Sequence, residues 1–267
     1  MELTARYGLE FNPFLKNAKE ILFLCNEWNE ALFRLNYLAS TKGFGLLTGA
    51  PGRGKTTVTR NWVSKLNPAL YKTVYTSLST VTVNDFYRNL AEALGAQPAY
   101  RKTENFHAIQ GEINRLCLEK RRTPVIVIDE ANYISNAVLN DLKILFNFEM
   151  DSRDRAIVLL VGLPQINHTL SLAIHEPLRQ RIIMNYNIEA YTKEEGKAYI
   201  QTKLNGAGCT QPVFEDAAIE AILNAAEGTA RMISKLCNAA LVIGNSQSQN
   251  LITVDTAMQA INESTLG

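Results

Sequence analysis

Hydrophobic residues in the first two thirds of the chain gather in short runs, and apolar residues recur at helical spacing between most of them. The runs are continuous and rich in Val, Ile and Leu, which is typical of strands buried on both faces of a parallel sheet. Alternation of such strands with helices predicts an α/β fold with a mostly parallel sheet. We expect strands at residues 44–48, 73–77, 125–129, 156–162 and 182–188.

The pattern changes from Thr192 onward, where strand signals fade and amphipathic helical patterns take over. We expect a small all-α domain after the sheet, so that the chain has an α/β domain over residues 1–190 and a helical domain over residues 191–267. The helices of the second domain are expected at residues 193–204, 215–226, 230–244 and 254–263.

Composition limits the kinds of partner that this chain can attract. Of its 267 residues 46% are hydrophobic, enough for a sizeable core, and 27 Lys and Arg against 26 Asp and Glu leave a formal charge of +1. A nearly neutral chain has no overall field that draws it to nucleic acid, so we expect any DNA contact to be local or shared among subunits.

Cysteine spacing and the amino terminus suggest where the protein works. Its four cysteines are far apart and lack metal-ligand or redox spacing, which favours free thiols in a reducing compartment. We find neither a secretory leader nor a window of about 18 uninterrupted apolar residues. We therefore expect a cytoplasmic protein that does not enter a membrane.

The stretch GLLTGAPGRGKTTVTR, residues 45–60, fits the pattern G-x-x-x-x-G-K-[ST] between a strand and a helix. Glycines let such a loop curl so that backbone N–H groups converge on phosphate oxygens, and the following helix adds the positive end of its dipole. We expect Lys55 to reach the β- and γ-phosphates and Thr56 to ligate Mg²⁺. The expected nucleotide contacts are Gly49, Ala50, Pro51, Gly52, Arg53, Gly54, Lys55, Thr56 and Thr57.

The stretch TPVIVIDEAN supplies the two acids that such a site needs. A buried strand delivers Asp129 and Glu130 to the carboxyl edge of the sheet, where ligands of parallel sheets bind. We expect Asp129 to hold Mg²⁺ through water and Glu130 to orient or activate the water that attacks the γ-phosphate. A hydrophobic strand ending in two acids is weak evidence alone, but it is strong when paired with the phosphate loop.

Two arginine sites follow in a particular order. EPLRQRI places Arg179 and Arg181 before the last expected strand, and EGTARMI places Arg231 at the start of a helix in the second domain. An arginine taken alone is more often an ordinary surface residue.

In this order the motifs resemble the AAA+ ATPases, and among them the ExeA-like group that includes transposition regulators of the TnsC, TniB and MuB type. The resemblance covers nearly the whole chain and rests on YGLEFNPF, GAPGRGKTT, VIVIDEAN, LLVGLPQ, LRQRI and EGTARMISKLCNAAL. It implies a P-loop AAA+ three-layer α/β sandwich followed by a helical lid, with ATP and Mg²⁺ as cofactors. Only the phosphate loop is specific by itself, and the order of the motifs carries the rest.

The resemblance also implies roles for the arginines. Arg179 or Arg181 would be an arginine finger that reaches the γ-phosphate held by a neighbouring subunit, and Arg231 would be a second sensor in the lid. ATP would then bind between protomers of a ring or a helical filament, and hydrolysis would be slow and dependent on assembly. Where many AAA+ proteins place a polar first sensor, residues 161–163 read Val-Gly-Leu, and Gln165 is the nearest polar substitute.

Aromatic and histidine side chains have alternative readings. Tyr7, Phe11 and Phe14, with Pro13, would pack around adenine by analogy with similar ATPases, within an amino-terminal segment of residues 1–40 near the nucleotide. A hydrophobic staple for the first helix is at least as good a reading. The three histidines, His107, His168 and His175, have no ligand spacing, so we expect no metal site beyond the magnesium.

Two basic segments are candidates for contacts with duplex DNA. In transposition regulators, basic residues on the inner face of a ring or filament follow the phosphate backbone, and a few contacts per subunit give strong, salt-sensitive binding. We expect Arg101 and Lys102 to make such contacts ahead of Arg121 and Arg122. Such charges otherwise mark a solvated helix end.

The sequence thus predicts an ATPase that oligomerises on target duplex DNA with ATP and recruits or activates a transposase, together with a target-selection protein or complex. The alternative is an ExeA-like secretion ATPase, or a signalling AAA+ protein, that acts on a protein partner without DNA.

Overall fold

The computed structural model describes residues 2–77, 81–150 and 152–264. The chain forms two compact units, an α/β unit and a helical unit, and the amino-terminal segment is part of the helical unit. One unit is an α/β sandwich made of Asn29–Ala50 and Lys55–Ile188; the other is helical and made of Met1–Trp28, Pro51–Gly54 and Glu189–Gly267.

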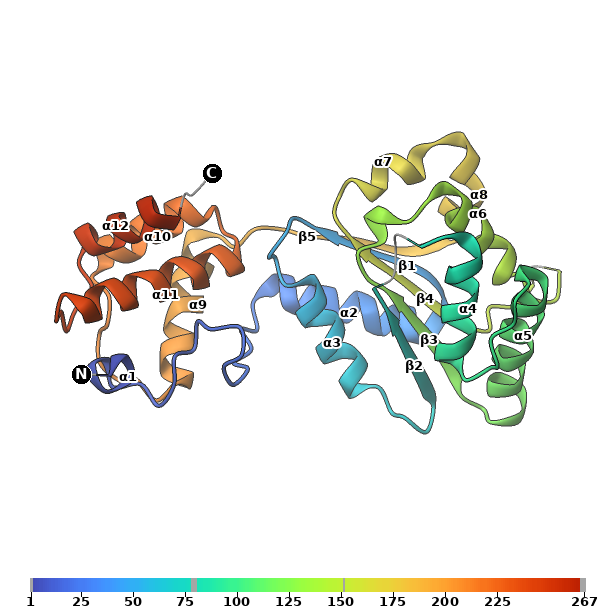
Figure 1. Ribbon diagram of the computed structural model, residues 1–267, viewed down its shortest axis with the longest axis horizontal. Helices are drawn as coiled ribbons and strands as arrows, with labels where there is room; N and C mark the ends of the chain where they lie inside the picture. Colours follow the sequence, from blue (N-terminus) through green and yellow to red (C-terminus); the bar gives the residue numbers. More distant parts are fainter. Residues whose placement is uncertain (1, 78–80, 151, 265–267) are drawn as a thin grey trace. The chain divides into compact units, whose positions relative to one another are not determined.

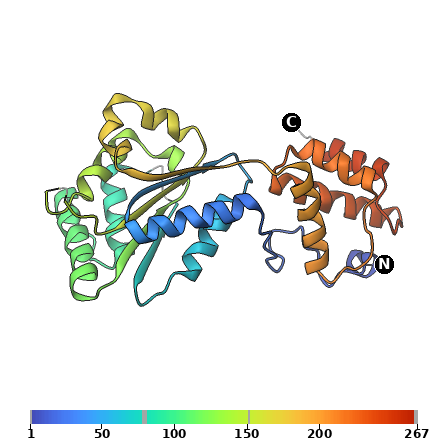
Figure 2. The same ribbon diagram turned by 180° about the vertical axis from the view of Figure 1, so that it is seen from behind.

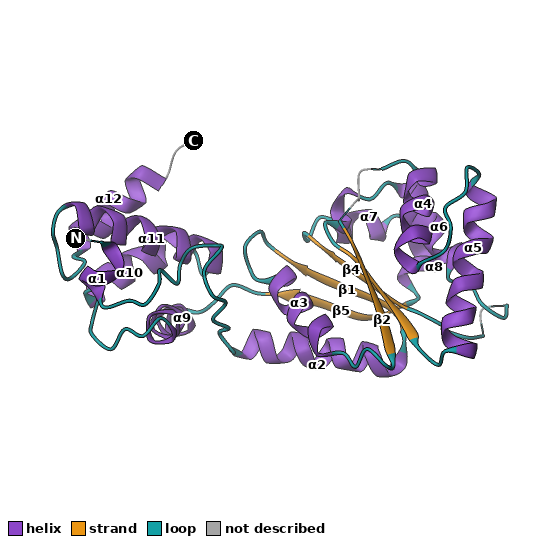
Figure 3. Cartoon of the chain, turned by 60° about the horizontal axis from the view of Figure 1, so that its bottom comes forward, coloured by secondary structure: helices purple, strands orange, loops and turns teal. Residues whose placement is uncertain are grey.

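The sandwich is built on one five-stranded sheet in which every strand pairing is parallel. Its order is β2-β3-β4-β1-β5, so β1 lies between β4 and β5 (Figure 3), and β2 and β5 are the two edges. This arrangement confirms the expected α/β class with a mostly parallel sheet. The strands are β1 (Gly43–Gly49), β2 (Tyr71–Thr76), β3 (Thr123–Ile128), β4 (Ile157–Gly162) and β5 (Ile182–Ile188).

Helices cover both faces of the sheet (Figures 1 and 2). Side chains such as Leu46, Ile126 and Leu160 point into the main core with α4, α5 and α6, while Gly45 and Leu159 face Leu38 of α2 on the opposite side. The helices of this part of the chain are α2 (Asn26–Thr41), α3 (Lys55–Lys65), α4 (Val83–Leu94), α5 (Lys102–Asn114), the π-helical turn η1 (Arg115–Glu119), the 3-10 turn η2 (Ala131–Tyr133), α6 (Asn136–Leu145), α7 (Ile166–Ser171), the 3-10 turn η3 (Ala173–His175) and α8 (Glu176–Arg179).

Local sequence explains where several of these helices begin and end. The Thr82 side chain accepts a hydrogen bond from the Asp85 N–H at 3.2 Å and caps α4, which ends at Gly95 with a left-handed φ of 91°. In the same way the Ser135 hydroxyl accepts from the N–H of Val138 and caps α6. The start of α6 fixes the chain that follows the two acids of the expected site.

The helical unit has its own core. It contains α1 (Leu3–Tyr7), α9 (Lys193–Gly206), α10 (Asp216–Ala226), α11 (Ala230–Ser246) and α12 (Val254–Ser264). A capping box of Thr192 and Glu195 begins α9. The four helices predicted from the periodicity after residue 191 are present within two residues of their expected ends.

The amino-terminal aromatic residues belong to this helical core. Tyr7 is 3% exposed and donates its hydroxyl to the Leu241 carbonyl at 3.4 Å, and Phe14 is 6% exposed against the edge of the Phe214 ring. Both side chains therefore pack inside the helical unit, and the expected contact with adenine stays a prediction. They fill the apolar faces that α9 to α11 leave between them, which accounts for the grouping of residues up to Trp28 with the helices. This differs from the expected domain of residues 1–190.

The part of the chain that the structure describes contains no helix whose length and apolar character would let it cross a membrane.

Candidate nucleotide-binding site

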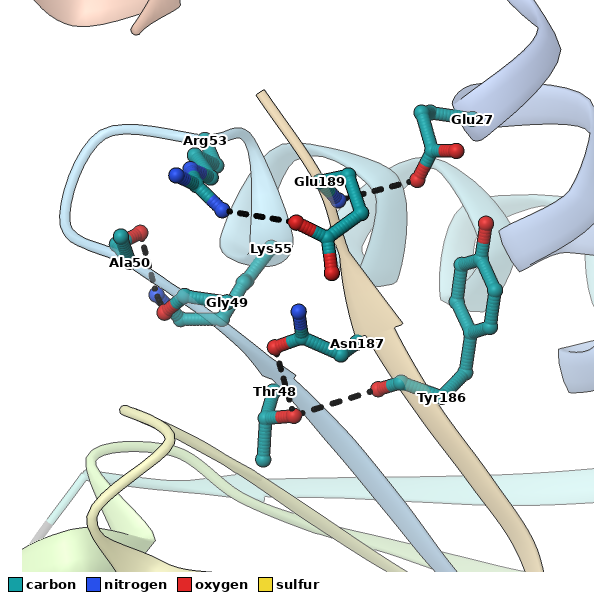
Figure 4. Close-up of polar contacts among 9 residues, drawn as sticks. All are labelled: Glu27, Thr48, Gly49, Ala50, Arg53, Lys55, Tyr186, Asn187 and Glu189. Carbon is teal, nitrogen blue, oxygen red and sulfur yellow. Dashed lines mark hydrogen bonds and ion pairs between the residues drawn. The ribbon is translucent and has the colours of Figure 1, made fainter.

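The phosphate loop follows a strand that is buried along its whole length, β1, and leads directly into α3. Gly52 and Gly54 have φ of 79° and 90°, which other residues adopt only with strain, so the loop requires glycine there. The Lys55 ammonium donates to the carbonyls of Gly49 at 2.7 Å and Ala50 at 3.1 Å (Figure 4). These contacts place its charge in the concave side of the loop, as phosphate binding requires.

The tip of the loop belongs to the helical unit. The carbonyl of Gly52 accepts a hydrogen bond from the N–H of Arg231 at 3.3 Å, at the start of α11. The Arg53 guanidinium lies 3.3 Å from a carboxylate oxygen of Glu189, whose N–H in turn donates to Glu27 (Figure 4). The helix that carries the expected second sensor therefore touches the phosphate loop through its backbone.

The residues expected to bind Mg²⁺ lie together near the end of β3. Asp129 is 6% exposed and accepts hydrogen bonds from the Thr56 hydroxyl at 3.1 Å and from the N–H of Glu130 at 2.9 Å. A hydroxyl and a carboxylate this close form the hard oxygen donor set that Mg²⁺ prefers, and Mg²⁺ typically binds through one or two such ligands plus substrate phosphates. These residues fit the expected metal.

Glu130 has an exposed side chain and a left-handed backbone with φ of 54°. A non-glycine residue in this region costs about 1–3 kcal/mol and persists only where its surroundings hold it. Here the Glu130 N–H is held by Asp129 and its carbonyl accepts from the N–H of Tyr133 at 3.0 Å. The turn thus leaves Glu130 exposed next to Asp129, which remains buried.

A polar side chain from η2 lies at the end of β4. The Asn132 amide oxygen accepts a hydrogen bond from the N–H of Leu163 at 3.0 Å, whereas Gln165 is exposed at the start of α7. Sequence reasoning missed Asn132, although its place in DEAN, three residues after Asp129, was a usable signal. The role expected for Gln165 stays a prediction.

Tyr75 also escaped the sequence analysis. Its hydroxyl donates to Asp129 Oδ2 at 2.9 Å from the penultimate residue of β2. Partial burial is the larger cause and this hydrogen bond to a carboxylate the smaller one, and together they raise the pKa of Tyr75 to about 12. The phenol is therefore a protonated donor at neutral pH.

A second polar pair lies beneath the loop, between β1 and the edge strand β5. The Thr48 hydroxyl is completely buried, 3.0 Å from Asn187 Oδ1 and 3.4 Å from the carbonyl of Tyr186 (Figure 4). A buried hydroxyl needs such a partner, and the contact fixes the end of β5 to the strand that carries the loop.

The two arginines before β5 have different surroundings. The Arg179 side chain is 47% exposed and pairs with Glu176 within α8, whereas Arg181 donates to the carbonyl of Lys143 at 2.8 Å and is partly buried. His175, just before α8, is fully buried and shares a 2.9 Å hydrogen bond with Asn136 at the start of α6. That contact links the helix of Arg179 to the segment that follows Glu130.

The basic residues predicted to bind DNA are not equivalent either. The Lys102 ammonium lies 2.6 Å from an Asp141 carboxylate oxygen and 5.3 Å from the centre of the Tyr87 ring. Arg101 and Arg121 are exposed, and Arg122 donates to the carbonyl of Tyr71 at 3.2 Å. Among the described residues, no group of His, Cys, Asp and Glu forms a further metal site.

Comparison with known proteins gives a consistent picture. Residues 38–170 match the AAA domain family. The chain is 29% identical over 255 residues to General secretion pathway protein A of Aeromonas hydrophila, covering 93% of this chain but only 46% of that protein.

Solved structures resemble the fold at lower identity. Cdc6p of Pyrobaculum aerophilum superposes with a TM-score of 0.72 at 15% identity, over 96% of this chain and 71% of that one. The Drosophila ORC bound to DNA gives a TM-score of 0.73 at 15% identity, over 100% of this chain and 67% of its own. Residues 38–170 therefore carry the match to the AAA domain family, and the loop, the two acids and the parallel sheet agree with an ATPase fold that uses ATP and Mg²⁺.

Proposed function

We propose that this protein is an ATP-controlled switch that assembles as a homo-oligomer, a ring or a helical filament, on duplex DNA. In the ATP state it recruits or activates a transposase at a site chosen by a target-selection protein or complex, and hydrolysis disassembles it. The observation that carries the first part of this proposal is the contact of Thr56 with Asp129 beside the exposed Glu130.

The site residues divide the work as follows. Lys55 and the loop N–H groups bind the phosphates, Thr56 and Asp129 hold the cation, and Glu130 orients and accepts a proton from the attacking water. Bound Mg²⁺ supplies charge neutralisation on the phosphate oxygens. The contact of Arg231 with Gly52 supports a role for α11 in reporting the state of the loop.

Assembly would complete the site through an arginine from a neighbour. We infer that Arg179 is the finger and Arg181 is not, because the Arg179 guanidinium is exposed and its contacts among the described residues, to Glu176 and the Ser171 carbonyl, are local. Arg181 is anchored to the main chain at the end of α6. An arginine supplied in trans makes turnover depend on assembly.

DNA binding would use the exposed cations that the structure leaves accessible. Lys102 is engaged with Asp141 and the Tyr87 ring, so Arg101 and Arg121 are better candidates for phosphate contacts than the sequence alone suggested. The resemblance of the fold to an ORC that was solved bound to DNA supports this part of the proposal. The transposase itself rests on the resemblance of the motifs to transposition regulators.

A second candidate function is favoured by the curated relative. The chain is 29% identical to a protein named for secretion, which supports the alternative of an ATPase that acts on a protein partner without DNA. The two candidates share the nucleotide site and differ in the partner.

Electron microscopy and filter binding with duplex DNA distinguish the two candidate functions. We expect rings or filaments on duplex DNA with ATP, absent in Lys55→Ala and persistent in Glu130→Gln, and an affinity that falls steeply with salt because counterions are released. An Arg101→Ala, Arg121→Ala double variant should weaken DNA binding without changing nucleotide binding. If the wild-type protein hydrolyses ATP yet never assembles on DNA, the secretion-type function is the better account.

A further inference from the structure

We propose that Tyr75 is a positioning residue for the metal-binding carboxylate of Asp129. The inference rests on the proposed role of Asp129 in holding Mg²⁺, and it does not depend on DNA or a transposase. It gives the nucleotide site a component on β2, a strand that supplies none of the residues expected from the sequence.

The geometry follows from the register of the sheet. Tyr75 of β2 pairs with Val127 of β3, and Asp129 lies two residues beyond Val127. Side chains two residues apart along a strand direction point to the same face, so the tyrosine and the aspartate share the face on which α3 begins. Tyr75 leans toward the carboxyl edge and its hydroxyl reaches Asp129 Oδ2 at 2.9 Å.

Three donors with different origins then hold one carboxylate. Tyr75 and Thr56 both donate to Oδ2, at 2.9 and 3.1 Å, and the Glu130 N–H donates to Oδ1 at 2.9 Å. The last torsion of an aspartate is broad and gives little orientation by itself. Donors from β2, α3 and the turn after β3 therefore fix the plane in which the carboxylate presents its remaining lone pairs.

Burial argues against a purely structural role for the tyrosine. Tyr75 is 57% exposed on an edge strand, whereas the neighbouring core residue of the same strand, Val74, is 4% exposed. A ring that is mostly in solvent contributes little to the core, yet its hydroxyl makes a hydrogen bond to a charged group that is almost fully buried. Such outer-shell partners of metal ligands typically affect metal affinity about 10- to 100-fold.

The opposite role is also testable. The Tyr75 hydroxyl donates to the same oxygen, Asp129 Oδ2, as the Thr56 hydroxyl. If the Tyr75 hydroxyl had to leave that oxygen before Mg²⁺ could bind, it would hinder the cation. Positioning predicts that removal of the hydroxyl weakens the response to Mg²⁺, whereas hindrance predicts that removal strengthens it.

The experiment compares Tyr75→Phe with Tyr71→Phe. The second variant removes a hydroxyl from the first residue of the same strand, which pairs with Thr123 at the amino-terminal end of β3. Binding of a fluorescent, slowly hydrolysed ATP analogue is titrated with MgCl2, and again in EDTA. We expect Tyr75→Phe to raise the Mg²⁺ concentration for half-maximal enhancement about tenfold, the low end of the range for such partners. Tyr71→Phe should match the wild type, and binding in EDTA should be the same for all three.

A double-variant arm tests whether the effect passes through the carboxylate. In an Asp129→Asn background, Tyr75→Phe should have no further effect, because the group that it positions has changed. An unchanged or lower Mg²⁺ requirement in Tyr75→Phe would overturn the inference. If Asp129→Asn itself leaves the Mg²⁺ response intact, the assignment of the metal site fails, and the role of Tyr75 fails with it.

Discussion

The last residue of β4, Gly162, sets the position of the turn that carries Glu130. A Cβ added at Gly162 would lie 3.0 Å from both the backbone nitrogen and the side-chain oxygen of Asn132, and 3.3 Å from the nitrogen of Ala131. Two of these atoms are backbone of η2, which follows Glu130 directly. We predict that Gly162→Ala displaces this turn and lowers both the rate of ATP hydrolysis and the stability of the fold.

The size of both effects can be estimated. Gly162 pairs with Thr48 of β1, and β4 is hydrogen-bonded to strands on both sides, so we expect the turn to move rather than the strand. Ordinary carbon contacts begin near 3.5 Å, so relief of a 3.0 Å contact needs a shift of about half an ångström. Overpacking of this kind costs about 1–3 kcal/mol, and the lower entropy of the unfolded alanine chain recovers about 0.4–1 kcal/mol. A displacement of 1 Å costs about 10²-fold in rate, so half of it costs about tenfold.

The assay is steady-state ATP hydrolysis at saturating ATP and MgCl2, alongside urea unfolding. Gly111→Ala is a matched control, because Gly111 lies inside α5 with no atom within 4 Å of an added Cβ. It should gain about 0.5–1 kcal/mol of stability and retain full turnover. Wild-type turnover and wild-type stability in Gly162→Ala would refute the reasoning, since the added methyl group would then have met no resistance from the turn.

Two more predictions concern α8 and the residues on either side of it. Arg179→Ala should lower turnover about 10³-fold or more, with nucleotide binding intact. Mixing it with Lys55→Ala should restore part of the activity, because one variant supplies the arginine and the other supplies the intact phosphate loop. Arg181→Ala mixed in the same way should show no such rescue, and failure of both mixtures would exclude a finger in trans. Burial lowers the pKa of His175 below its value of about 6.5 in the unfolded chain, so the folded protein loses stability as pH falls below about 6.5. Urea unfolding at pH 7.5 and 5.5 should show that His175→Gln loses less free energy of unfolding than the wild type. An equal loss of free energy would assign the pH dependence to other groups.

The central strands and the loop could be predicted from sequence because their physics is local. Continuous apolar runs mark strands buried on both faces, as in β1, β3 and β4, and the glycine and lysine spacing marks the loop. The edge strand β2 was harder. It begins at Tyr71 although we expected residue 73, because only Val74 is buried along its length and an edge strand needs no continuous apolar run.

The contacts that sequence reasoning missed join residues far apart in the chain. Tyr75 meets Asp129 because two parallel strands share a register, and Asn132 meets Leu163 because a turn approaches the neighbouring strand. The aromatic residues near the amino terminus were the hardest, since the Tyr7 hydroxyl donates to the carbonyl of Leu241, 234 positions away. A local pattern cannot indicate which of several apolar surfaces such side chains will cover.

The place of β1 between β4 and β5 has a consequence for synthesis on the ribosome. The strand that carries the phosphate loop is translated early, but the residues it pairs with, 157–162 and 182–188, emerge more than a hundred residues later. Until then GFGLLTG, the strand whose every residue is buried in the finished sheet, has neither hydrogen-bonded neighbour. Such an open apolar strand is prone to aggregate. Until β4 and β5 have left the exit tunnel, the nascent chain should therefore be at risk of aggregation through this strand.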